Sequence, residues 1–330
     1  MHQPSLHQLL GIAPPTSTRR GGLRVIDLFC GGGGFSCGAV QAGCDVILAV
    51  DSNEEAIEYH RRNHPSTAHV VATLPCERLA LPDDGKPFHL HLSPPCQAFS
   101  TNCTRGVDRT DASRDMVEWS LRFAIASKAT TWSLEEVNAP PVRATLDRIK
   151  AEFPAQMDWH VFPFCDLGVP QTRKRVIAGP PALVAALKAR CCRSKRRSVR
   201  DAFGAKARAP YVRNAASKLS GVKRANPNPQ QARYIYKKAT WADFCKPIDG
   251  PAPVACAGNV GLHWILHLDS DTRPIRFTPR ESAVLQTFPA SYKLPDRVGL
   301  AHLLVGNAVP PLVSKQIMEC AVELTKRMTA

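Results

Sequence analysis

The feature that most constrains the fold is a glycine-rich turn between two short apolar runs. The first run, 23–29, has the unbroken apolar character of a buried parallel strand, and the glycines 31–34 follow it closely. An apolar helical stretch then leads to a second run, 44–51, which ends in an acid. Strand, turn, helix and strand form a βαβ unit, in which the two strands run parallel. The sequence therefore predicts an α/β fold with a doubly wound parallel sheet.

The alternation continues more weakly towards residue 180. Expected strands lie at 68–74, 88–92, 131–136, 158–164 and 175–178. Expected helices lie at 54–63 with Ser52 as N-cap, at 116–127, after Pro141, at 279–286 and at 311–328. The sequence between 180 and about 278 has no clear period. We therefore predict a loosely ordered leader at 1–22, a ligand-binding and catalytic domain at 23–180, a basic region at 181–275 and a segment at 276–330 that returns to the catalytic domain.

The net charge is +15, and it is unevenly distributed. Residues 181–250 contain 17 Lys and Arg but only 3 Asp and Glu, so this segment carries nearly all of the excess. A basic segment attached to a neutral body is typical of proteins that bind polyanions. A solvated basic loop has the same composition, so the charge alone leaves both interpretations open.

The composition excludes several classes of protein. Hydrophobic residues make up 44% of the chain and charged residues 22%, which is ordinary for a globular protein. No apolar run approaches the roughly 18 residues that a membrane span needs, and the first residues lack a signal-peptide pattern. We therefore expect a soluble, intracellular protein with no membrane partner. The 12 cysteines include no CxxC pair, so we predict no metal site and expect most of them to be reduced and buried.

The glycine-rich turn also indicates a ligand. Glycines allow the backbone to approach a ligand at a helix N-terminus, and Asp51 at the end of the next strand is placed to bind ribose hydroxyls. Such a turn suits a nicotinamide, a flavin or S-adenosylmethionine, and it also occurs as a purely structural turn. Four consecutive glycines do not follow the GxGxxG spacing, which argues against a dinucleotide.

Three further groups of residues suggest chemistry at strand ends. Cys96 follows two prolines after an apolar strand, so its thiol is held in a fixed direction, although a lone cysteine is usually structural. Glu135 and Glu136 end another apolar strand, where one of them could donate a proton or simply be solvated. Arg173 and Arg175 point the same way on extended chain, which suits a phosphate, a base carbonyl or a solvated edge.

Taken together, these motifs resemble the C5-cytosine DNA methyltransferases over most of residues 23–328. Six motifs stand in the order of that family: DLFCGGGGFS at 27–36, SPPCQAFS at 93–100, EEV at 135–137, QTRKR at 171–175, PRESAVLQTFP at 279–289 and VGNAVPP at 305–311. The family places its target-recognition region between the fourth and fifth motifs, and this interval contains the whole basic segment 181–250. The resemblance implies a Rossmann-like catalytic domain that uses S-adenosyl-L-methionine, with a small basic target-recognition region.

The resemblance implies a reaction and a set of residues. Cys96 would add to C6 of a flipped cytosine in duplex DNA, and C5 of the covalent adduct would then take the methyl group. The implied catalytic residues are Cys96, Glu135, Arg173 and Arg175. The implied cofactor-binding residues are Asp27, Phe29, Cys30, Gly31, Gly33, Gly34, Asp51, Ser52, Thr73, Pro95, Asn307 and Val309. The implied DNA-binding residues are Gln97, Ser100, Lys195, Arg196 and Arg197. The expected partners are double-stranded DNA and a cognate restriction endonuclease, with the chain acting as a monomer in the cytoplasm of a prokaryote or a virus-infected cell.

The chain departs from the family pattern at three positions. Glu136 stands where the family has an Asn that orients the Pro-Cys loop, Thr73 stands where it has an adenine-contacting Asp, and Cys30 replaces a common Ala. These departures keep open a catalytically impaired relative that still binds DNA. An RNA cytosine-5 methyltransferase is a further alternative, although the Cys-Phe-Thr signature of the tRNA-methylating branch is absent. The Pro-Pro-Cys-Gln context argues against a nicotinamide oxidoreductase.

Overall fold

The computed structural model describes residues 22–76, 79, 81–95, 109–191, 193–203, 233–235, 246–247, 251–252, 264–266, 274–276 and 278–329. The chain divides into two compact units. The first comprises Met1–Pro163, Lys174–Arg193 and Ala308–Ala330, and the second comprises Phe164–Arg173 and Ser194–Asn307. The leader predicted at 1–22 and most of the basic region predicted at 181–275 lie outside the described residues.

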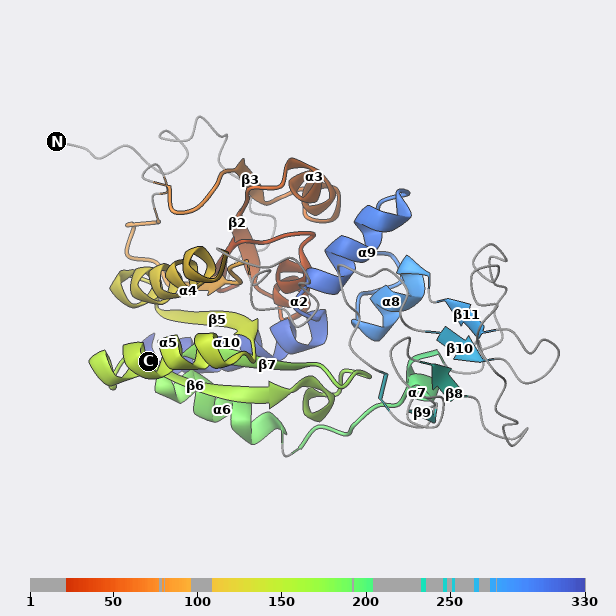
Figure 1. The fold of residues 1–330 in the computed structure, drawn as a ribbon. Helices are drawn as coiled ribbons and strands as arrows, with labels where there is room; N and C mark the ends of the chain where they lie inside the picture. Colours follow the sequence, from red (N-terminus) through yellow and green to blue (C-terminus); the bar gives the residue numbers. More distant parts are fainter. Residues whose placement is uncertain are drawn as a thin grey trace. The chain divides into compact units, whose positions relative to one another are not determined.

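The first unit is built on one sheet (Figure 1). Its strands are β1 (Arg24–Leu28), β2 (Asp45–Asp51), β3 (Ala68–Val71), β4 (Phe88–Leu92), β5 (Thr131–Val137), β6 (Asp158–Pro163) and β7 (Lys174–Gly179). These strands form a seven-stranded sheet in the order β3-β2-β1-β4-β5-β7-β6. The pairs among β1 to β5 are parallel, whereas β7 is antiparallel to both β5 and β6. The α/β fold is confirmed, with β7 as the exception to the predicted parallel sheet, because the connection from β6 is too short to hold a crossover helix.

Helices cover both faces of this sheet. They are α2 (Gly34–Gln41), α3 (Glu54–Asn63), α4 (Arg109–Ala126), α5 (Pro140–Glu152), α6 (Pro181–Cys191) and α10 (Pro311–Thr329). The connection from β1 leads to β2 on one side along the sheet, and the connection from β4 leads to β5 on the other side. Because both connections are right-handed, their helices α2 and α4 lie on opposite faces of the sheet. On the α2 face, α10 packs against α2 and α6. A Cβ on Gly38 would lie 2.2 Å from the Pro311 carbonyl oxygen, so glycine is required for this close packing.

The α4 face carries the main apolar core. Alternate residues of the central strands point into it, among them Ile26 and Leu28 of β1, Leu90 and Leu92 of β4, and Leu134 of β5. They meet buried side chains from α4 and α5, including Val117, Leu121, Leu146 and Ile149. All of these side chains are closed to water, so the hydrophobic effect stabilises this side of the sheet.

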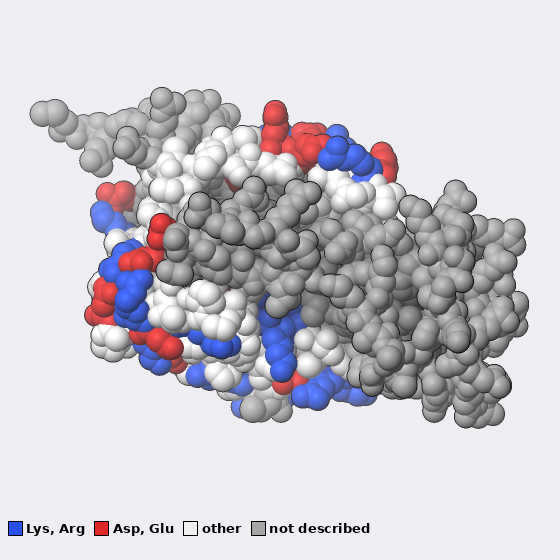
Figure 2. All heavy atoms as spheres, viewed as in Figure 1, with Lys and Arg blue, Asp and Glu red and all other residues white. Residues whose placement is uncertain are grey.

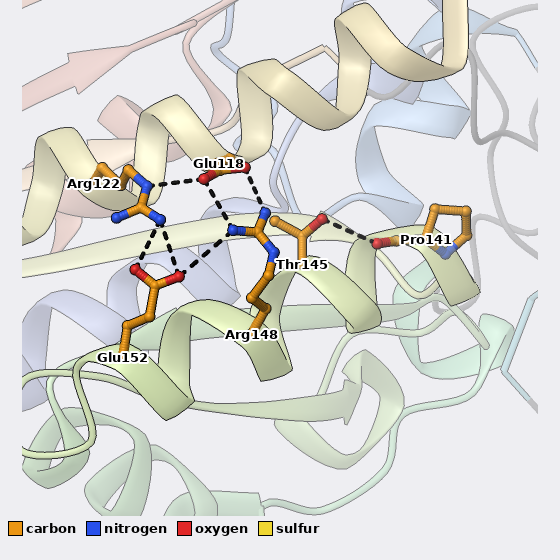
Figure 3. A network of polar contacts seen from close by, with 6 residues as sticks. All are labelled: Glu118, Arg122, Pro141, Thr145, Arg148 and Glu152. Carbon is orange, nitrogen blue, oxygen red and sulfur yellow. Dashed lines mark hydrogen bonds and ion pairs between the residues drawn. The ribbon is translucent and has the colours of Figure 1, made fainter.

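A charged network ties α4 to α5 on the outer surface (Figure 3). Glu118 accepts hydrogen bonds from Arg122, one helical turn later on α4, and from Arg148 on α5. Glu152 on α5 pairs with both arginines, with an oxygen 2.8 Å from an Arg122 nitrogen. These groups are largely exposed, so water and salt weaken each pair, and the sharing of partners helps hold the two helices together.

In its described residues the second unit contains a small antiparallel sheet, a 3-10 helix at Phe164–Leu167 and three α-helices. The strands are β8 (Arg233–Ile235), β9 (Lys246–Pro247), β10 (Trp264–Leu266) and β11 (Pro274–Arg276), in the order β11-β10-β8-β9. The helices are α7 (Val199–Phe203), α8 (Pro279–Leu285) and α9 (Val298–Asn307). Thr278 and Glu281 form a reciprocal capping box at the start of α8. Gln286 donates to the Val305 carbonyl oxygen at 2.9 Å, which fixes α8 against α9.

Most predicted elements are confirmed within one to three residues, but several details differ. The N-cap of α3 is Asn53, whose side chain accepts the Ala56 N–H, and not Ser52. The segment 164–173 belongs to the second unit and α6 to the first, so the compact units do not follow the predicted limits at 180 and 275; the functional division stays a prediction. Within the described ranges, no helix is long and apolar enough to cross a membrane.

Candidate active site

Four strand ends meet at one edge of the sheet. Register partners across β2, β1, β4 and β5 are Val50, Leu28, Leu92 and Leu134. The residues that directly follow them are Asp51, Phe29, Ser93 and Glu135. The carboxyl edge of a doubly wound sheet, where neighbouring crossovers diverge, is where such folds bind ligands. In this sheet the divergence falls between β1 and β4.

Hydrogen bonds hold the glycine turn to the neighbouring strand ends. Asp51 Oδ2 accepts the Gly31 N–H at 2.8 Å, and Asp51 Oδ1 accepts the Asn53 N–H at 2.8 Å. On the other side, the Ser93 hydroxyl donates to the Phe29 carbonyl oxygen at 3.1 Å. Sequence reasoning missed Ser93 and Asn53 in these roles, although each stands directly beside a residue or motif that it had singled out.

The backbone of the turn is left-handed at three positions. Phe29, Gly31 and Gly33 have φ values of 59°, 52° and 88°. Glycine adopts this conformation freely, whereas Phe29 is strained there, which is common where a backbone is shaped for a ligand. The space around an added Cβ at Gly31 is empty to 4 Å. An open glycine backbone beside a strand-end carboxylate leaves space at this turn for a ligand with hydroxyl groups.

Asp27 lies directly below this turn and is fully buried. Its Oδ2 lies 2.7 Å from the Ser36 hydroxyl, in the first turn of α2, while its Oδ1 has no hydrogen-bond partner. Burial raises the pKa of Asp27 to about 7, and the nearby Asp51 adds to the shift. Burial also raises the pKa of Asp51, and it raises that of the Cys30 thiol in the turn. Cys30 is therefore a neutral, buried side chain.

Glu135 and Arg175 form an ion pair at the end of β5. Arg175 Nε lies 3.1 Å from Glu135 Oε1, and the side chains are 17% and 8% exposed. Arg175 stands at the start of β7 because this strand runs antiparallel to β5, with Val137 and Arg175 as register partners. The antiparallel strand thus brings the fourth motif of the sequence to the same edge as the third.

Glu136 is buried on the opposite face of β5 from Glu135. One carboxyl oxygen accepts the Val137 N–H, and the other has no hydrogen-bond partner. Burial raises the pKa of Glu136 to about 8, and the neighbouring Glu135 adds to the shift. At neutral pH the Glu136 carboxyl group is therefore mostly protonated.

The two arginines predicted to act together have different partners. Arg173 is buried in the second unit and donates from Nη1 to the Gly306 carbonyl oxygen at 2.8 Å. Asn307, the next residue, ends α9 and is exposed. Val309 is buried in the first unit, two residues before α10. In the structure, Arg173 thus binds the VGNAVPP motif and Arg175 binds Glu135.

The remaining predicted residues vary in what the structure describes. Cys96, Gln97 and Ser100 lie outside the described residues. Ser52, Thr73 and Pro95 are exposed, and Gly33 and Gly34 are buried at the start of α2. Thr73 lies two residues beyond the end of β3, on the same edge as Asp51. Within the described part of the chain, no group of His, Cys, Asp or Glu side chains could hold a metal ion.

The predicted DNA contacts 195–197 are exposed in the second unit. Arg196 forms an ion pair with Asp166 at 2.6 Å, and Arg197 donates to the Asp201 carbonyl oxygen at 3.4 Å. On the face shown in Figure 2, acidic and basic side chains lie intermixed over the region of α4 and α5. That part of the surface therefore offers no single-sign field to a polyanion.

Comparison with known proteins identifies the family. A family model described as C-5 cytosine-specific DNA methylase matches residues 23–179 and 194–323. The chain is similar to the Type II methyltransferase M.HgiDI of Herpetosiphon aurantiacus, with 25% identity over 309 residues that cover 87% of this chain and 90% of that protein. It is also similar to the Type II methyltransferase M1.HphI of Haemophilus parahaemolyticus, with 26% identity over 337 residues that cover 92% of this chain and 87% of that protein.

Solved structures share the fold. A putative DNA modification methyltransferase encoded within a prophage of E. coli superposes with a TM-score of 0.61 at 19% identity, covering 92% of this chain and 99% of that one. The S. pombe Dnmt2 methyltransferase superposes with a TM-score of 0.59 at 16% identity, covering 93% of this chain and all of that one. With the family model spanning most of the sequence and the glycine turn, Glu135 and Arg175 at one sheet edge, the chain belongs to the C-5 cytosine-specific DNA methylase family.

Proposed function

We propose that this chain is an active DNA (cytosine-5-)-methyltransferase that takes its methyl group from S-adenosyl-L-methionine. The observation that carries the proposal is the buried Glu135–Arg175 pair, which lies at the same sheet edge as the glycine turn. The neighbouring strand, β4, leads directly into Pro94, Pro95 and Cys96. A carboxylate fixed by an arginine, an acceptor for a ribose and a prolyl-cysteine segment are therefore supplied by adjacent strands.

The glycine turn is the proposed cofactor site. Asp51 would accept the ribose hydroxyls, because each of its oxygens keeps a lone pair beyond the backbone N–H that it already binds. Phe29 and the open backbone at Gly31 would contact the rest of the cofactor. When bound there, S-adenosylmethionine supplies an electrophilic methyl group on a sulfonium.

The chemistry on the base is assigned to residues of this chain. Cys96, as a thiolate, attacks C6 of the cytosine and makes C5 nucleophilic. Glu135 binds N3 and the exocyclic amine, and Arg175 holds the Glu135 carboxyl group in place. After methyl transfer, loss of the C5 proton and then of the thiolate restores the aromatic base. The target base leaves the duplex to reach these groups, because a stacked cytosine does not expose C6 to them.

The neutral state of Glu136 favours an active enzyme over a catalytically impaired relative. A second ionised carboxylate beside Glu135 would repel the electron-rich base, but burial keeps Glu136 protonated at neutral pH. A protonated carboxyl group resembles an amide, with one donor and one acceptor, so it can stand in for the Asn of the family pattern. Double-stranded DNA is the proposed partner, contacted in part by 195–197, with the chain acting as an intracellular monomer paired with a restriction endonuclease.

Bisulfite sequencing of DNA from cells that express the chain tests this function. We expect methylated cytosines within one short recognition sequence, and none in cells that express Cys96→Ser. A serine hydroxyl ionises far less readily than a thiol, so it cannot replace the nucleophile at neutral pH. Bisulfite treatment of RNA from the same cells separates the RNA alternative. Methylation of RNA alone, or full DNA methylation by Cys96→Ser, would contradict the proposal.

The two adjacent acids should behave differently. Glu135→Gln should lose most of the activity, because the group that binds and protonates N3 is gone. Glu136→Asn should keep or raise it, because a neutral group replaces a neutral group. Initial rates of methyl transfer to DNA, with thermal melting as the control for folding, measure both. If Glu136→Asn is dead and Glu135→Gln active, the roles of the two acids are exchanged.

A further inference from the structure

A chain of four hydrogen-bonded polar groups, three of them fully buried, begins at Asp27 and leads away from the glycine turn. Ser36 Oγ lies 2.7 Å from Asp27 Oδ2 and 3.0 Å from His60 Nε2. His60 Nδ1 lies 2.8 Å from His69 Nε2. Asp27, Ser36 and His60 are fully buried, whereas His69 on β3 is only partly so. This hydrogen-bonded chain therefore connects Asp27, below the glycine turn, to the partly exposed side chain of His69.

The direction of the hydrogen bonds depends on the charge of Asp27. With neutral imidazoles, the chain can be hydrogen-bonded in either direction. In one direction His60 donates from Nδ1 to His69 and accepts at Nε2 from Ser36, whose oxygen then accepts from a protonated Asp27. In the other direction His69 donates to His60, His60 donates to Ser36, and Ser36 donates to an ionised Asp27. The same geometry thus accommodates both charge states of Asp27, one for each direction of the chain.

Burial favours the neutral form of the groups at both ends of this hydrogen-bonded chain. It raises the pKa of Asp27 to about 7, and it lowers the pKa of His69 to about 4 and that of His60 well below its usual value. The titratable or charged groups around the chain are Cys30 in the turn, Asp51 on β2, His91 on β4, and Glu58, Arg61 and His64 on α3. In the described residues neither Asp27 nor Asp51 forms an ion pair, so the turn holds one fully buried and one partly buried acid, which together would favour a cation.

Given the proposed function, on which this inference rests, we propose that Asp27 is a neutral acid before the cofactor binds, and that Ser36 and His60 are positioning residues that take up its proton and hold Asp27 as a carboxylate when the positively charged cofactor arrives. The proton of Asp27 Oδ2 then moves to Ser36 Oγ as the Ser36 proton moves to His60 Nε2. The Nδ1 proton of His60 moves to His69 Nε2, and His69 releases one proton to water. Asp27 becomes a carboxylate opposite a cation, and one proton enters the solvent.

This coupling would help the protein to distinguish its cofactor from the product. S-adenosylmethionine carries a sulfonium charge that S-adenosylhomocysteine lacks. Only the attraction to this positive charge can offset the free energy that ionising a buried acid costs. With Asp27 protonated the difference in affinity is small, and with Asp27 ionised it is large. Cofactor affinity should therefore rise with pH through about 7, and product affinity should change much less.

Titration calorimetry in buffers of different ionisation enthalpy counts the released protons directly. At pH 7 we expect about half a proton per bound S-adenosylmethionine, because a group at its pKa is half protonated, and clearly fewer for S-adenosylhomocysteine. Asp27→Asn should release none. Binding of S-adenosylmethionine without proton release would overturn the proposed coupling and leave the cofactor assignment standing. Absence of any binding would overturn the cofactor assignment and this inference together.

Variants of Ser36 test its role apart from a merely structural one. Ser36→Ala removes the hydroxyl that stabilises ionised Asp27, so the pH at which affinity rises should move above 7, whereas structural damage would lower affinity equally at every pH. Ser36→Thr keeps the hydroxyl and should restore the wild-type pH profile. Ser314→Ala is the matched control, because Ser314 is a buried serine on α10 whose hydroxyl, within the described part of the chain, donates to the Pro310 carbonyl oxygen at the start of its own helix and hydrogen-bonds to no titratable group. An unchanged pH profile in Ser36→Ala would refute the role of the chain.

Discussion

Strands β1, β4 and β5 present opposite chemistries on two faces that are equally closed to water. Towards α4 and α5 they place Ile26, Leu90 and Leu134 among other apolar side chains. Towards α2 the same strands place Asp27, His89, His91 and Ser133. In β4 the two kinds of residue alternate along Phe88–Leu92, and all five are buried. Burial alone therefore does not determine what a strand residue does in this protein.

The polar face is organised around shared hydroxyl groups and one aromatic ring. Ser133 Oγ lies 2.9 Å from His89 Nε2 and 2.8 Å from His91 Nδ1. The Phe35 ring, from α2, stacks on His91 with ring centroids 3.4 Å apart. Burial lowers the pKa of both imidazoles, so they are neutral, whereas the apolar side chains on the other face do not titrate. The comparison indicates that one half of the core depends on pH and the other does not.

The largest expected effect is acid unfolding driven by the polar face. Burial lowers the pKa of His64 to about 4 and of His89 to about 3, and it lowers those of His60 and His91 well below their usual value. Stability from these groups is present above pH 6.5, the unfolded value, and is lost as the pH falls towards the folded values. The free energy of unfolding, measured in urea at each pH, should fall steeply between pH 6.5 and pH 5.

Two buried acids oppose this trend and set its size. The raised pKa values of Asp27 and Glu136 favour the folded state as the pH falls through the same range. The imidazoles with a lowered pKa, His69 included, outnumber these two acids and the partly buried Asp51, so the net effect is a loss of stability as the pH falls. As a control, His91→Leu should take up one proton fewer on acid unfolding. A free energy of unfolding that stays constant from pH 7 to pH 5 would mean that the polar face is no more sensitive to pH than the apolar face.

The next largest effect concerns the apolar face alone. Leu90 is fully buried against the α4 side of the sheet, so Leu90→Ala should destabilise the protein by about 2–5 kcal/mol through the cavity that it leaves. Because no titratable group is involved, the loss should be the same at pH 7.5 and pH 6. Val71→Ala, at a residue 50% exposed on β3, is the control and should change stability by less than about 0.5 kcal/mol. A strongly pH-dependent loss in Leu90→Ala would show that the two faces are coupled.

The smallest effect sharpens the role of the shared hydroxyl. Ser133→Ala removes a hydrogen-bond partner from both His89 and His91, so a loss of about 1–3 kcal/mol is expected. Ser120→Ala on α4 is the matched control, because the buried Ser120 hydroxyl has no hydrogen-bond partner in the described structure. Urea unfolding at pH 7.5 should therefore leave Ser120→Ala close to wild type. Equal losses of unfolding free energy in the two variants would mean that removing a buried hydroxyl destabilises the protein regardless of its hydrogen bonds.

Prediction from the sequence succeeded where short-range pattern and chemistry coincide. Hydrophobic periodicity and turn-forming residues marked the elements that were found. These are the apolar runs of β1 and β2, the glycine turn, and the strand ends at Asp51 and Glu135. Helix α6 was missed because its composition merges with the basic segment and its apolar residues do not form a one-sided stripe. The antiparallel direction of β7 was missed because a strand of six residues carries no mark of its direction.

By itself, the sequence determined the family, the order of the elements and the residues proposed for catalysis, since these follow from local pattern and motif spacing. Only the tertiary structure decided that Arg175 meets Glu135, because a register between β5 and β7 brings together residues 40 positions apart. It also decided that Asp27, Ser36, His60 and His69 form one hydrogen-bonded chain across β1, α2, α3 and β3. The physical reason is that charge state and hydrogen-bond direction depend on burial and on neighbours from distant elements, which the order of residues does not encode locally.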